Sequence, residues 1–255
     1  MEILGQPLKN LGTVAGSPPC ETFSTADASN ITRDNFHRDH SKKDKPPRSK
    51  ESCKTPAAHQ KRLKAIAHDH LVKQIVRSYI KDQRDGITYD MIMENPLGSL
   101  RQRPYMRGEA IEKYLHRETT NYCAYGKEYA KATDWWTSLA WTPKGSTGNG
   151  RCCNGACGQG QRKQRTGKFN HHKVIGGASD RAIKGPNKLK QLWEIPQPLI
   201  HEVMQVVGPA KFEGEIFMDL FSGGQSWKEE VMAKGYHYVS LDLSAAPTDS
   251  TDSVQ

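Results

Sequence analysis

Short apolar runs and helical repeats of apolar residues alternate along the first hundred residues. The run 11–16 predicts a strand that stops at residues 17–19, because the two prolines there fix the backbone and remove amide donors. Residues 55–56 (Thr-Pro) are typical of a helix start. Apolar side chains then recur at helical spacing to about residue 82; they are Leu63, Ile66, Ala67, Leu71, Ile75, Val76, Tyr79 and Ile80. A turn at 85–86 and an apolar run over 87–93 follow, so this part of the chain predicts a parallel strand pair with a helical crossover.

The last third of the chain has the most regular pattern. Apolar runs over 216–221 and 236–242 predict two strands, and residues 226–234 between them predict a helix that ends at Gly235. A short amphipathic helix is expected over 198–207. We therefore expect an α/β fold with one doubly wound, Rossmann-like sheet, which binds its ligand at the carboxyl ends of the strands.

Two internal segments are too polar to build a core. Residues 25–56 are rich in Lys, Arg, Asp and His and are expected to form a long mobile loop. Residues 143–186 are dominated by Gly, Lys, Arg, Cys and His and are expected to form a surface insertion. The segments 1–142 and 187–243 would then be two parts of one domain, followed by a disordered tail over 244–255.

Composition and charge narrow the class of partner. The 255 residues include 37 Lys and Arg against 28 Asp and Glu, a net charge of +9. This excess predicts a polyanionic partner such as DNA, and the alternative is a generally basic surface. No apolar stretch resembles a signal segment or is long enough to span a bilayer, so we expect no membrane partner and a cytoplasmic or nuclear location. The cysteines are then expected to be thiols or metal ligands before disulfides.

Three motifs combine residue types that carry chemistry. Residues 16–24 read GSPPCETFS and hold Cys20 at the tip of a stiff loop, although most cysteines are simply small apolar residues that pack under a turn. Residues 94–96 read Glu-Asn-Pro at the end of an expected strand. Residues 219–224 read DLFSGG, a strand end whose backbone amides can approach a ligand, unless it is a purely structural turn. Asp242, which ends the next strand, can accept hydrogen bonds from both hydroxyls of a ribose.

Together the three motifs resemble those of the DNA cytosine-5 methyltransferases, including phage and algal members. The resemblance implies transfer of a methyl group from S-adenosylmethionine to carbon 5 of cytosine in DNA. Cys20 would add to carbon 6 as the nucleophile, and Glu94 would be the acid at ring nitrogen 3. Asn95 belongs to the same catalytic motif. Arg101 and Arg103 would help to hold the flipped nucleotide, and the alternative for them is a solvated basic turn.

The resemblance also implies a set of residues that bind the cofactor. They are Pro18, Asp219, Phe221, Ser222, Gly223, Gly224, Ser226, Trp227 and Asp242. The chain departs from the family pattern at Pro96, and also at Gln225 and Ser226, where glycines are expected. Two alternative functions stay open: a methyltransferase that acts on RNA or another base, and a non-catalytic nucleic-acid-binding protein with a degenerate methyltransferase fold.

The order of the motifs differs from the usual family order, in which the cofactor motif precedes the cysteine motif. Here the cofactor motif follows it, which predicts a circularly permuted methyltransferase with a catalytic part over 1–142 and a cofactor-binding part over 187–243. The strand expected between Asp242 and the cysteine strand has no clear counterpart, unless residues 1–4 supply a short substitute.

The basic insertion carries soft and imidazole ligands. A structural zinc ion could be held by Cys152, Cys157, His171 and His172; Cys153 is the neighbour of Cys152. This segment has few apolar side chains to bury, so it would need the metal for stability. The alternative is a basic loop whose cysteines are incidental. The insertion occupies the place of the family's target-recognition region, and its Lys and Arg side chains favour phosphate contacts.

Overall fold

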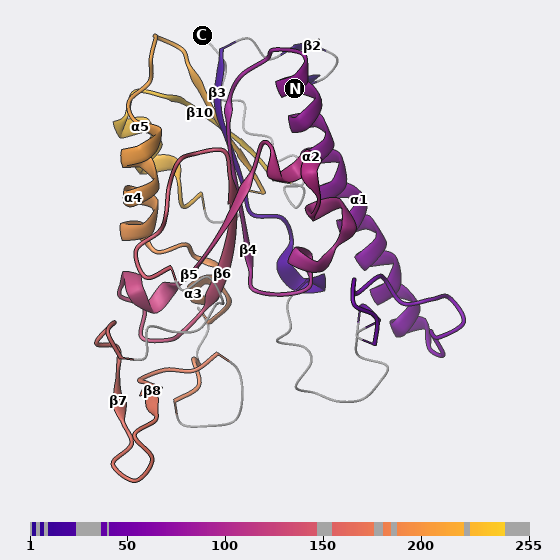
Figure 1. The fold of residues 1–255 in the computed structure, drawn as a ribbon, viewed down its shortest axis with the longest axis vertical. Helices are drawn as coiled ribbons and strands as arrows, with labels where there is room; N and C mark the ends of the chain where they lie inside the picture. Colours follow the sequence, from indigo (N-terminus) through magenta and orange to yellow (C-terminus); the bar gives the residue numbers. More distant parts are fainter. Residues whose placement is uncertain are drawn as a thin grey trace, which may run out of the picture.

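A six-stranded sheet with helices on both faces forms the body of the molecule (Figure 1). The computed structural model describes residues 2–3, 6–7, 10–23, 37–39, 41–146, 155–175, 181–184, 188–221 and 225–242. The strand order is β10-β9-β3-β4-β6-β5. The strands are β3 (Leu11–Gly16), β4 (Asp90–Pro96), β5 (His116–Asn121), β6 (Ala132–Thr137), β9 (Ile216–Leu220) and β10 (His237–Leu241).

The first four strands in this order are parallel, and β6 is antiparallel to both of its neighbours. Helix α1 (Pro56–Arg84) links β3 to β4, and α5 (Lys228–Ala233) links β9 to β10. Figure 1 shows α1 on one face of the sheet, with α5 and α4 (Gln197–Val207) on the other. The mixed α/β class and both expected strand–helix–strand units are therefore confirmed.

Helix α1 begins as predicted and buries a different face from the one predicted. The Thr55 side chain accepts a hydrogen bond from the Ala58 amide, and Pro56 takes the first helical position. Leu63 and Ile66, assigned to the apolar face, are 42% and 38% exposed. In this half of the helix the buried residues include polar ones, which bind the loop after β3 and are described with the site below.

Strand β4 begins and ends later than the run 87–93 predicts. Ile87 is 46% exposed and precedes the strand. The strand instead continues through the Glu-Asn-Pro motif, in which Glu94 pairs with Trp135 and Pro96 with Thr133 on β6. Pairing with an adjacent antiparallel strand thus keeps the motif extended to its last residue.

Two apolar clusters fill the space between the sheet and its helices. One lies under α1 and includes Val72, Val76 and Tyr79. The other lies under α4 and α5 and includes Leu199, Ile200, Val203, Phe217 and Trp227. Trp135 and Trp136, neighbours on β6, are both buried and belong to opposite clusters, because successive side chains of a strand point to opposite faces.

Residues 2–3, the described part of the segment 1–4, do not extend the six-stranded sheet beyond Asp242. Strand β1 (Glu2–Ile3) pairs with β2 (Gln6–Pro7) in a separate two-stranded sheet, so the alternative of a substitute strand does not hold for these residues. Within the described residues, β10 is the outermost strand on its side of the six-stranded sheet.

Short elements connect the larger ones. They are the 3-10 helices η1 (Cys20–Thr22), η4 (Leu100–Gln102), η5 (Pro104–Met106) and η6 (Tyr122–Tyr125), and the helices α2 (Glu109–Glu112) and α3 (Lys188–Trp193). Among the helices of the described ranges, none has the length and apolar character that crossing a bilayer requires.

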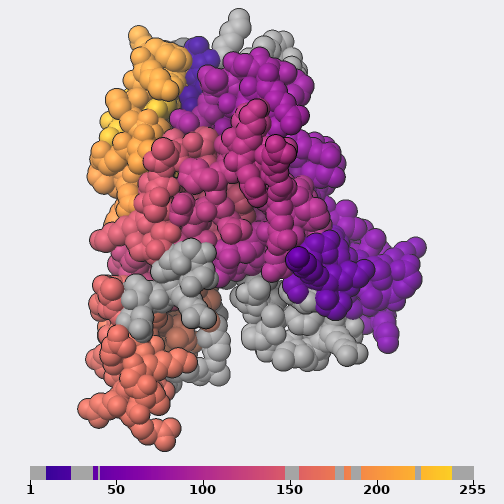
Figure 2. All heavy atoms as spheres, in the orientation of Figure 1, coloured from indigo at the N-terminus to yellow at the C-terminus, as the bar shows by residue number. Residues whose placement is uncertain are grey.

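The two polar segments differ in how they meet the body. The described part of the insertion forms a hairpin of β7 (Gly160–Arg162) and β8 (Phe169–His171), which projects from the body in Figure 2. In the segment 25–56, residues 37–39 and 41–54 contain no helix or extended strand. Arg38 is nevertheless 1% exposed. The prediction of a mobile solvated loop is therefore wrong at Arg38, whose charge is held inside the protein.

Candidate active site

The three sequence motifs meet at one edge of the sheet. Strands β9, β3 and β4 are parallel neighbours in which Gly16 pairs with both Leu220 and Met93, so the segments that follow these three residues start side by side. The Ser17 amide donates to the Leu220 carbonyl at 3.2 Å, which joins the cysteine loop to the end of β9. The crossovers from β3 and from β9 run outward in opposite directions, so this edge is the topological switch point where open α/β sheets bind ligands.

Cys20 lies in η1, directly after the two prolines, and is partly buried. Burial raises the pKa of its thiol, the Glu94 carboxylate raises it further, and Lys131 lowers it. The charge of Glu94 therefore opposes ionisation of the Cys20 thiol. At neutral pH this environment keeps Cys20 as the thiol in the ligand-free protein.

Glu94 is 5% exposed on β4 and has two polar neighbours. The Tyr122 hydroxyl donates to Glu94 Oε1 at 3.0 Å, and Lys131 Nζ lies 3.8 Å from the same oxygen. Burial and the Glu94 carboxylate together raise the pKa of Tyr122, which therefore remains a donor. A hydrogen-bond donor and a cation thus lie next to Glu94 in its buried position.

Asn95 fastens the cysteine loop to β4. Its side chain is fully buried, and Nδ2 donates to the Pro18 carbonyl at 3.1 Å. A second tie lies close by, where the Ser99 amide and hydroxyl donate to the Phe23 carbonyl at 2.7 and 3.0 Å. Gly98 permits this approach, because a Cβ there would lie 2.1 Å from the Phe23 oxygen. The sequence identified Asn95 from its motif but gave no sign that Gly98 and Ser99 hold the same loop.

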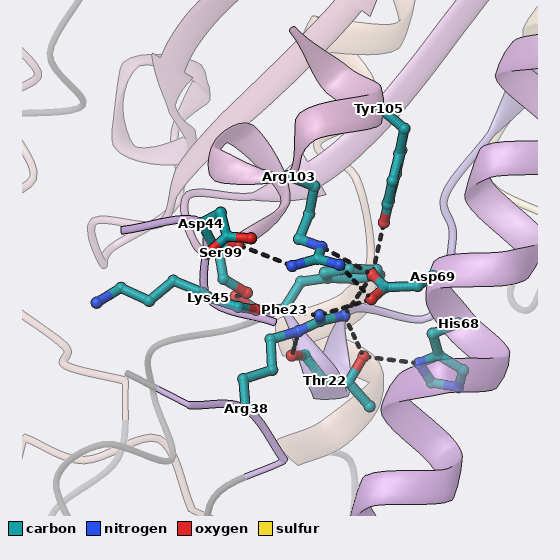
Figure 3. Close-up of polar contacts among 10 residues, drawn as sticks. All are labelled: Thr22, Phe23, Arg38, Asp44, Lys45, His68, Asp69, Ser99, Arg103 and Tyr105. Carbon is teal, nitrogen blue, oxygen red and sulfur yellow. Dashed lines mark hydrogen bonds and ion pairs between the residues drawn. The ribbon is translucent and has the colours of Figure 1, made fainter. Parts of the chain in front are cut away.

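A buried ion-pair network supports the loop from its other side (Figure 3). The Asp69 carboxylate, on α1, accepts from Arg38 at 3.1 and 2.9 Å, from Arg103 at 3.2 and 2.8 Å, and from the Tyr105 hydroxyl at 2.6 Å. Arg38 also donates through Nε to the Thr22 carbonyl at 2.6 Å. The network therefore connects α1 to η1, two residues from Cys20.

His68 adds a further contact between the same two elements. Its Nδ1 lies 3.0 Å from the Thr22 hydroxyl. Burial and the nearby Lys64 lower the pKa of His68, so the neutral ring is favoured. His68 and Asp69 are polar residues on the buried side of a helix, and this is the one sequence signal that could have revealed the network.

Arg101 and Arg103 are engaged with carboxylates of the protein. Arg101 donates through Nε to Asp134 at 2.8 Å and through Nη2 to the Thr119 hydroxyl at 3.0 Å. Arg103 binds Asp69 and is 8% exposed. A solvated basic turn is therefore wrong for Arg103, and both guanidinium groups have internal partners that position the segment after the Glu-Asn-Pro motif.

The end of β9 brings two carboxylates together. Asp219 is 2% exposed and accepts a hydrogen bond from the Tyr238 hydroxyl at 2.7 Å. Burial raises the pKa of Asp219 to about 6, and the nearby Asp242 contributes to the increase. A ligand with hydroxyl donors or a positive charge would relieve this unfavourable pair.

The backbone after β9 adopts a conformation that is rare for residues other than glycine. Phe221 has φ +64° and Gln225 has φ +50°. A bulky aromatic residue with positive φ is an outlier of the kind that gathers at ligand-binding turns. The Phe221 amide donates to the Leu241 carbonyl at 2.6 Å, so β10 helps to hold the turn. The predicted ligand contacts at Ser222, Gly223 and Gly224 lie outside the described residues.

Comparisons with protein-family models and with curated proteins find no match for this chain. The assignment of the site therefore depends on its own residues. Among the predicted cofactor-binding residues, Pro18, Asp219, Phe221 and Asp242 lie at the shared edge or enter its contacts. Trp227 does not: its ring is 3% exposed and packs in the core, with centroids 5.7 Å from Phe217 and 6.3 Å from Trp135.

Ser226 forms a hydrogen bond with helix α4. Its carbonyl accepts from Gln197 Nε2, at the start of α4, at 3.2 Å. This contact, together with the burial of Trp227, indicates that the segment after Gln225 positions α5.

A cavity of about 450 Å³ opens beside η1, between the cysteine loop and α1. Its lining includes Glu21, His37, Lys61 and Lys64. Glu21 lies close to both His37 and Lys64. Lys61 and Lys64 therefore line this depression together with Glu21, the residue that follows Cys20 in the chain.

The predicted metal ligands are brought together only in part. Cys157 and His171 lie close to each other, with Sγ and Nε2 separated by 3.7 Å. The third member of their group is Cys123, from η6 in the body, and His172 does not belong to it. His172 follows the last residue of β8 and is not a member of this group among the described residues. Cys152 and Cys153 lie outside the described residues.

Proposed function

We propose that this protein is an S-adenosylmethionine-dependent DNA cytosine-5 methyltransferase. The observation that carries the proposal is the hydrogen bond from Asn95, next to Glu94 on β4, to the Pro18 carbonyl of the Cys20 loop, beside the switch point formed by β3 and β9. A nucleophile, an acid that is coupled to it and a ligand-binding edge are the parts that this reaction requires.

The residues at the end of β9 fit a nucleoside cofactor with a cationic centre. Asp242 and Asp219 offer carboxylates to hydroxyl donors or positive charge, and the left-handed Phe221 turns the chain away at the strand end. These three residues would hold S-adenosylmethionine. When bound, S-adenosylmethionine supplies an activated methyl group for carbon 5.

The chemistry assigned to the chain begins with Cys20. Its thiol would lose a proton to solvent, and the thiolate would add to carbon 6 of cytosine while Glu94 donates a hydrogen bond or a proton to ring nitrogen 3, which makes carbon 5 nucleophilic. After methylation, loss of the carbon 5 proton to solvent, departure of the Cys20 sulfur from carbon 6 and return of any nitrogen 3 proton to Glu94 would restore the ring.

The coupling between Cys20 and Glu94 favours this sequence of events. A Glu94 carboxylate raises the pKa of the thiol and Lys131 lowers it. A neutral Glu94 that donates a hydrogen bond to nitrogen 3 would not oppose the thiolate, and Lys131 would stabilise it. The thiolate would thus form when the base is in place.

DNA is the proposed polyanion. The net charge is +9, and the cavity beside η1 is lined by Lys61 and Lys64. The hairpin of the insertion adds four exposed cations: Arg162, Lys163, Arg165 and Lys168. These two surfaces could contact phosphates on either side of the target base. Zinc, proposed for the insertion, would have a structural role, because the presumed nucleophile is outside the metal group.

A non-catalytic nucleic-acid-binding protein is the second candidate. It is favoured by the outermost position of β10 in the described sheet, where the family resemblance implies a further strand. It predicts DNA binding without methyl transfer.

The test uses the full chain with radiolabelled S-adenosylmethionine and either DNA or RNA. The product is digested to nucleosides and identified by mass spectrometry. The proposal predicts 5-methyldeoxycytidine from DNA, loss of product in Cys20→Ser, and unchanged product in the control Cys53→Ser. Methylated RNA or another methylated base would establish the alternative substrate, and DNA binding without any methylated product would favour the second candidate.

A further inference from the structure

Three donor atoms from distant parts of the sequence converge at the base of the insertion. The sulfurs of Cys123 and Cys157 and a ring nitrogen of His171 all lie within 4.8 Å of one another. Cys157 Sγ and His171 Nε2 are 3.7 Å apart. Zinc–ligand bonds of about 2.3 Å to sulfur and about 2.0–2.1 Å to nitrogen give tetrahedral donor–donor distances of about 3.5–3.8 Å. The spacing thus matches two corners of a zinc tetrahedron.

The three residues come from elements that hold them in place. Cys123 is 1% exposed in η6, which belongs to the body. Cys157 lies in the turn before β7, between Gly155 and Gly158, both with positive φ. His171 ends β8, and its ring packs edge-on against Phe169, with centroids 5.1 Å apart. A backbone turn and an aromatic contact therefore aim two ligands of the hairpin at a buried cysteine of the body.

The hairpin meets the body at a second point close to this group. The Lys173 amide, two residues after His171, donates to the Glu128 carbonyl at 3.0 Å. This backbone bond joins the same two segments, so the approach of Cys123 to the hairpin does not depend on the sulfurs alone. A cavity of about 580 Å³, lined in part by Lys127, Tyr129 and Lys173, lies along this junction.

We infer that Cys123, Cys157 and His171 supply three of the four ligands of a structural zinc site that fastens the insertion to the body of the protein. Two thiolates and an imidazole are a soft donor set, which selects zinc over magnesium or calcium. Apolar side chains are scarce in the hairpin, and a metal would supply the stability that its burial cannot. The site differs from one built within the insertion, because its buried ligand belongs to η6.

The zinc site would also fix the hairpin relative to the proposed acid. Cys123 follows Tyr122, whose hydroxyl donates to Glu94. Metal binding would hold η6 and the hairpin as one unit next to this contact. This consequence rests on the proposed function, whereas the zinc site itself does not.

The first test is metal analysis of the full chain, purified without chelator from zinc-supplemented medium. We expect about one zinc per chain in the wild type. Cys123→Ser, Cys157→Ser and His171→Ala should each lose most of this zinc. The matched control is Cys53→Ser, since Cys53 lies far from the group in sequence and hydrogen-bonds the Ser49 carbonyl; it should keep the full amount. Circular dichroism checks that each variant is folded.

The second test needs no variant. Trypsin cleaves after Lys and Arg, and within 155–175 the exposed sites are Arg162, Lys163, Arg165 and Lys168. We expect slow cleavage at these sites in the zinc-loaded wild type. Removal of the metal by a chelator should accelerate the cleavage at least about tenfold, because cleavage by a protease depends on local opening of the chain. A wild type without zinc would overturn the inference. So would zinc that survives in Cys123→Ser, or cleavage that ignores the chelator. Either set of results is independent of methyl transfer.

Discussion

Replacement of Asp69 by asparagine should strongly destabilise the fold. The carboxylate compensates two buried guanidinium groups, of Arg38 and Arg103, and also accepts from Tyr105. Removing one partner of a buried ionic group costs about 3–5 kcal/mol, because the remaining charge stays buried without compensation. The amide keeps one acceptor oxygen, so we expect the lower part of this range. For a chain of this size, each kcal/mol lowers the melting temperature by about 2–4 °C, which predicts a decrease of about 6–12 °C.

The matched control is Asp85→Asn. Asp85 pairs with Lys81 on the surface of α1, where the two side chains are 48% and 74% exposed. An exposed pair four residues apart contributes about 0.3–0.5 kcal/mol, so the melting temperature should change by about 2 °C or less. Thermal unfolding followed by circular dichroism compares the two variants at the same pH and salt concentration. If Asp69→Asn melted with the control, the network would not be a stabilising centre.

The same variant tests whether the network positions the cysteine loop. Arg38 donates to the Thr22 carbonyl, so a displaced guanidinium would shift η1 and Cys20 with it. A displacement of about 1 Å at a reacting atom can lower the rate about 10²-fold. Methyl transfer measured well below the melting temperature should therefore decrease far more in Asp69→Asn than in Asp85→Asn. Equal rates for the two folded proteins would refute this positioning role.

Three further variants test the site. Asn95→Asp replaces the donor to the Pro18 carbonyl with a carboxyl group at a fully buried position, and should lower the melting temperature followed by circular dichroism and also lower methyl transfer, measured well below that temperature, about 10²-fold. Gly98→Ala places a Cβ against the Phe23 carbonyl and should lower the free energy of unfolding in urea by about 1–3 kcal/mol. The pKa of Asp219 is raised from 3.8 to about 6, so the free energy of unfolding of the wild type should fall as pH rises from about 4 to about 6. Asp219→Asn should remove this fall. At pH 7.5 the variant should be more stable than the wild type by up to about 3 kcal/mol. Unfolding titrations at several pH values measure it, and an unchanged pH profile in the variant would contradict the assignment.

The fold could be predicted where apolar periodicity and chain punctuation agree. Three signals in the sequence act on the backbone locally and mark where an element begins or ends. They are the prolines after Gly16, the Thr-Pro pair before α1 and Gly235 after α5. Each lies within a few residues of the boundary that the structure shows. Periodicity predicts that Leu63 lies on the buried face of α1, yet its side chain is 42% exposed, because this half of the helix packs against a polar loop. Periodicity cannot distinguish an apolar stripe that faces the core from one that faces solvent.

The site could be predicted only where its residues belong to short motifs. Cys20, Glu94 and Asn95 are each recognisable beside their sequence neighbours. Arg38 could not be found, because its partner Asp69 is 31 residues away and nothing in the polar segment around Arg38 marks it as buried. Cys123 was missed as a metal ligand for the same reason, since its partners lie on a hairpin that only the fold brings to it.

Covalent trapping tests the central claim most directly. The full chain is incubated with S-adenosylmethionine and DNA that contains 5-fluorocytosine, from which a methylated cysteine adduct cannot be released because fluorine does not leave as the carbon 5 proton does. We predict a denaturant-resistant protein–DNA complex whose digest places the adduct on Cys20, present in Cys53→Ser and absent in Cys20→Ser. The absence of a complex from wild-type protein that is shown to bind both DNA and S-adenosylmethionine would contradict the account.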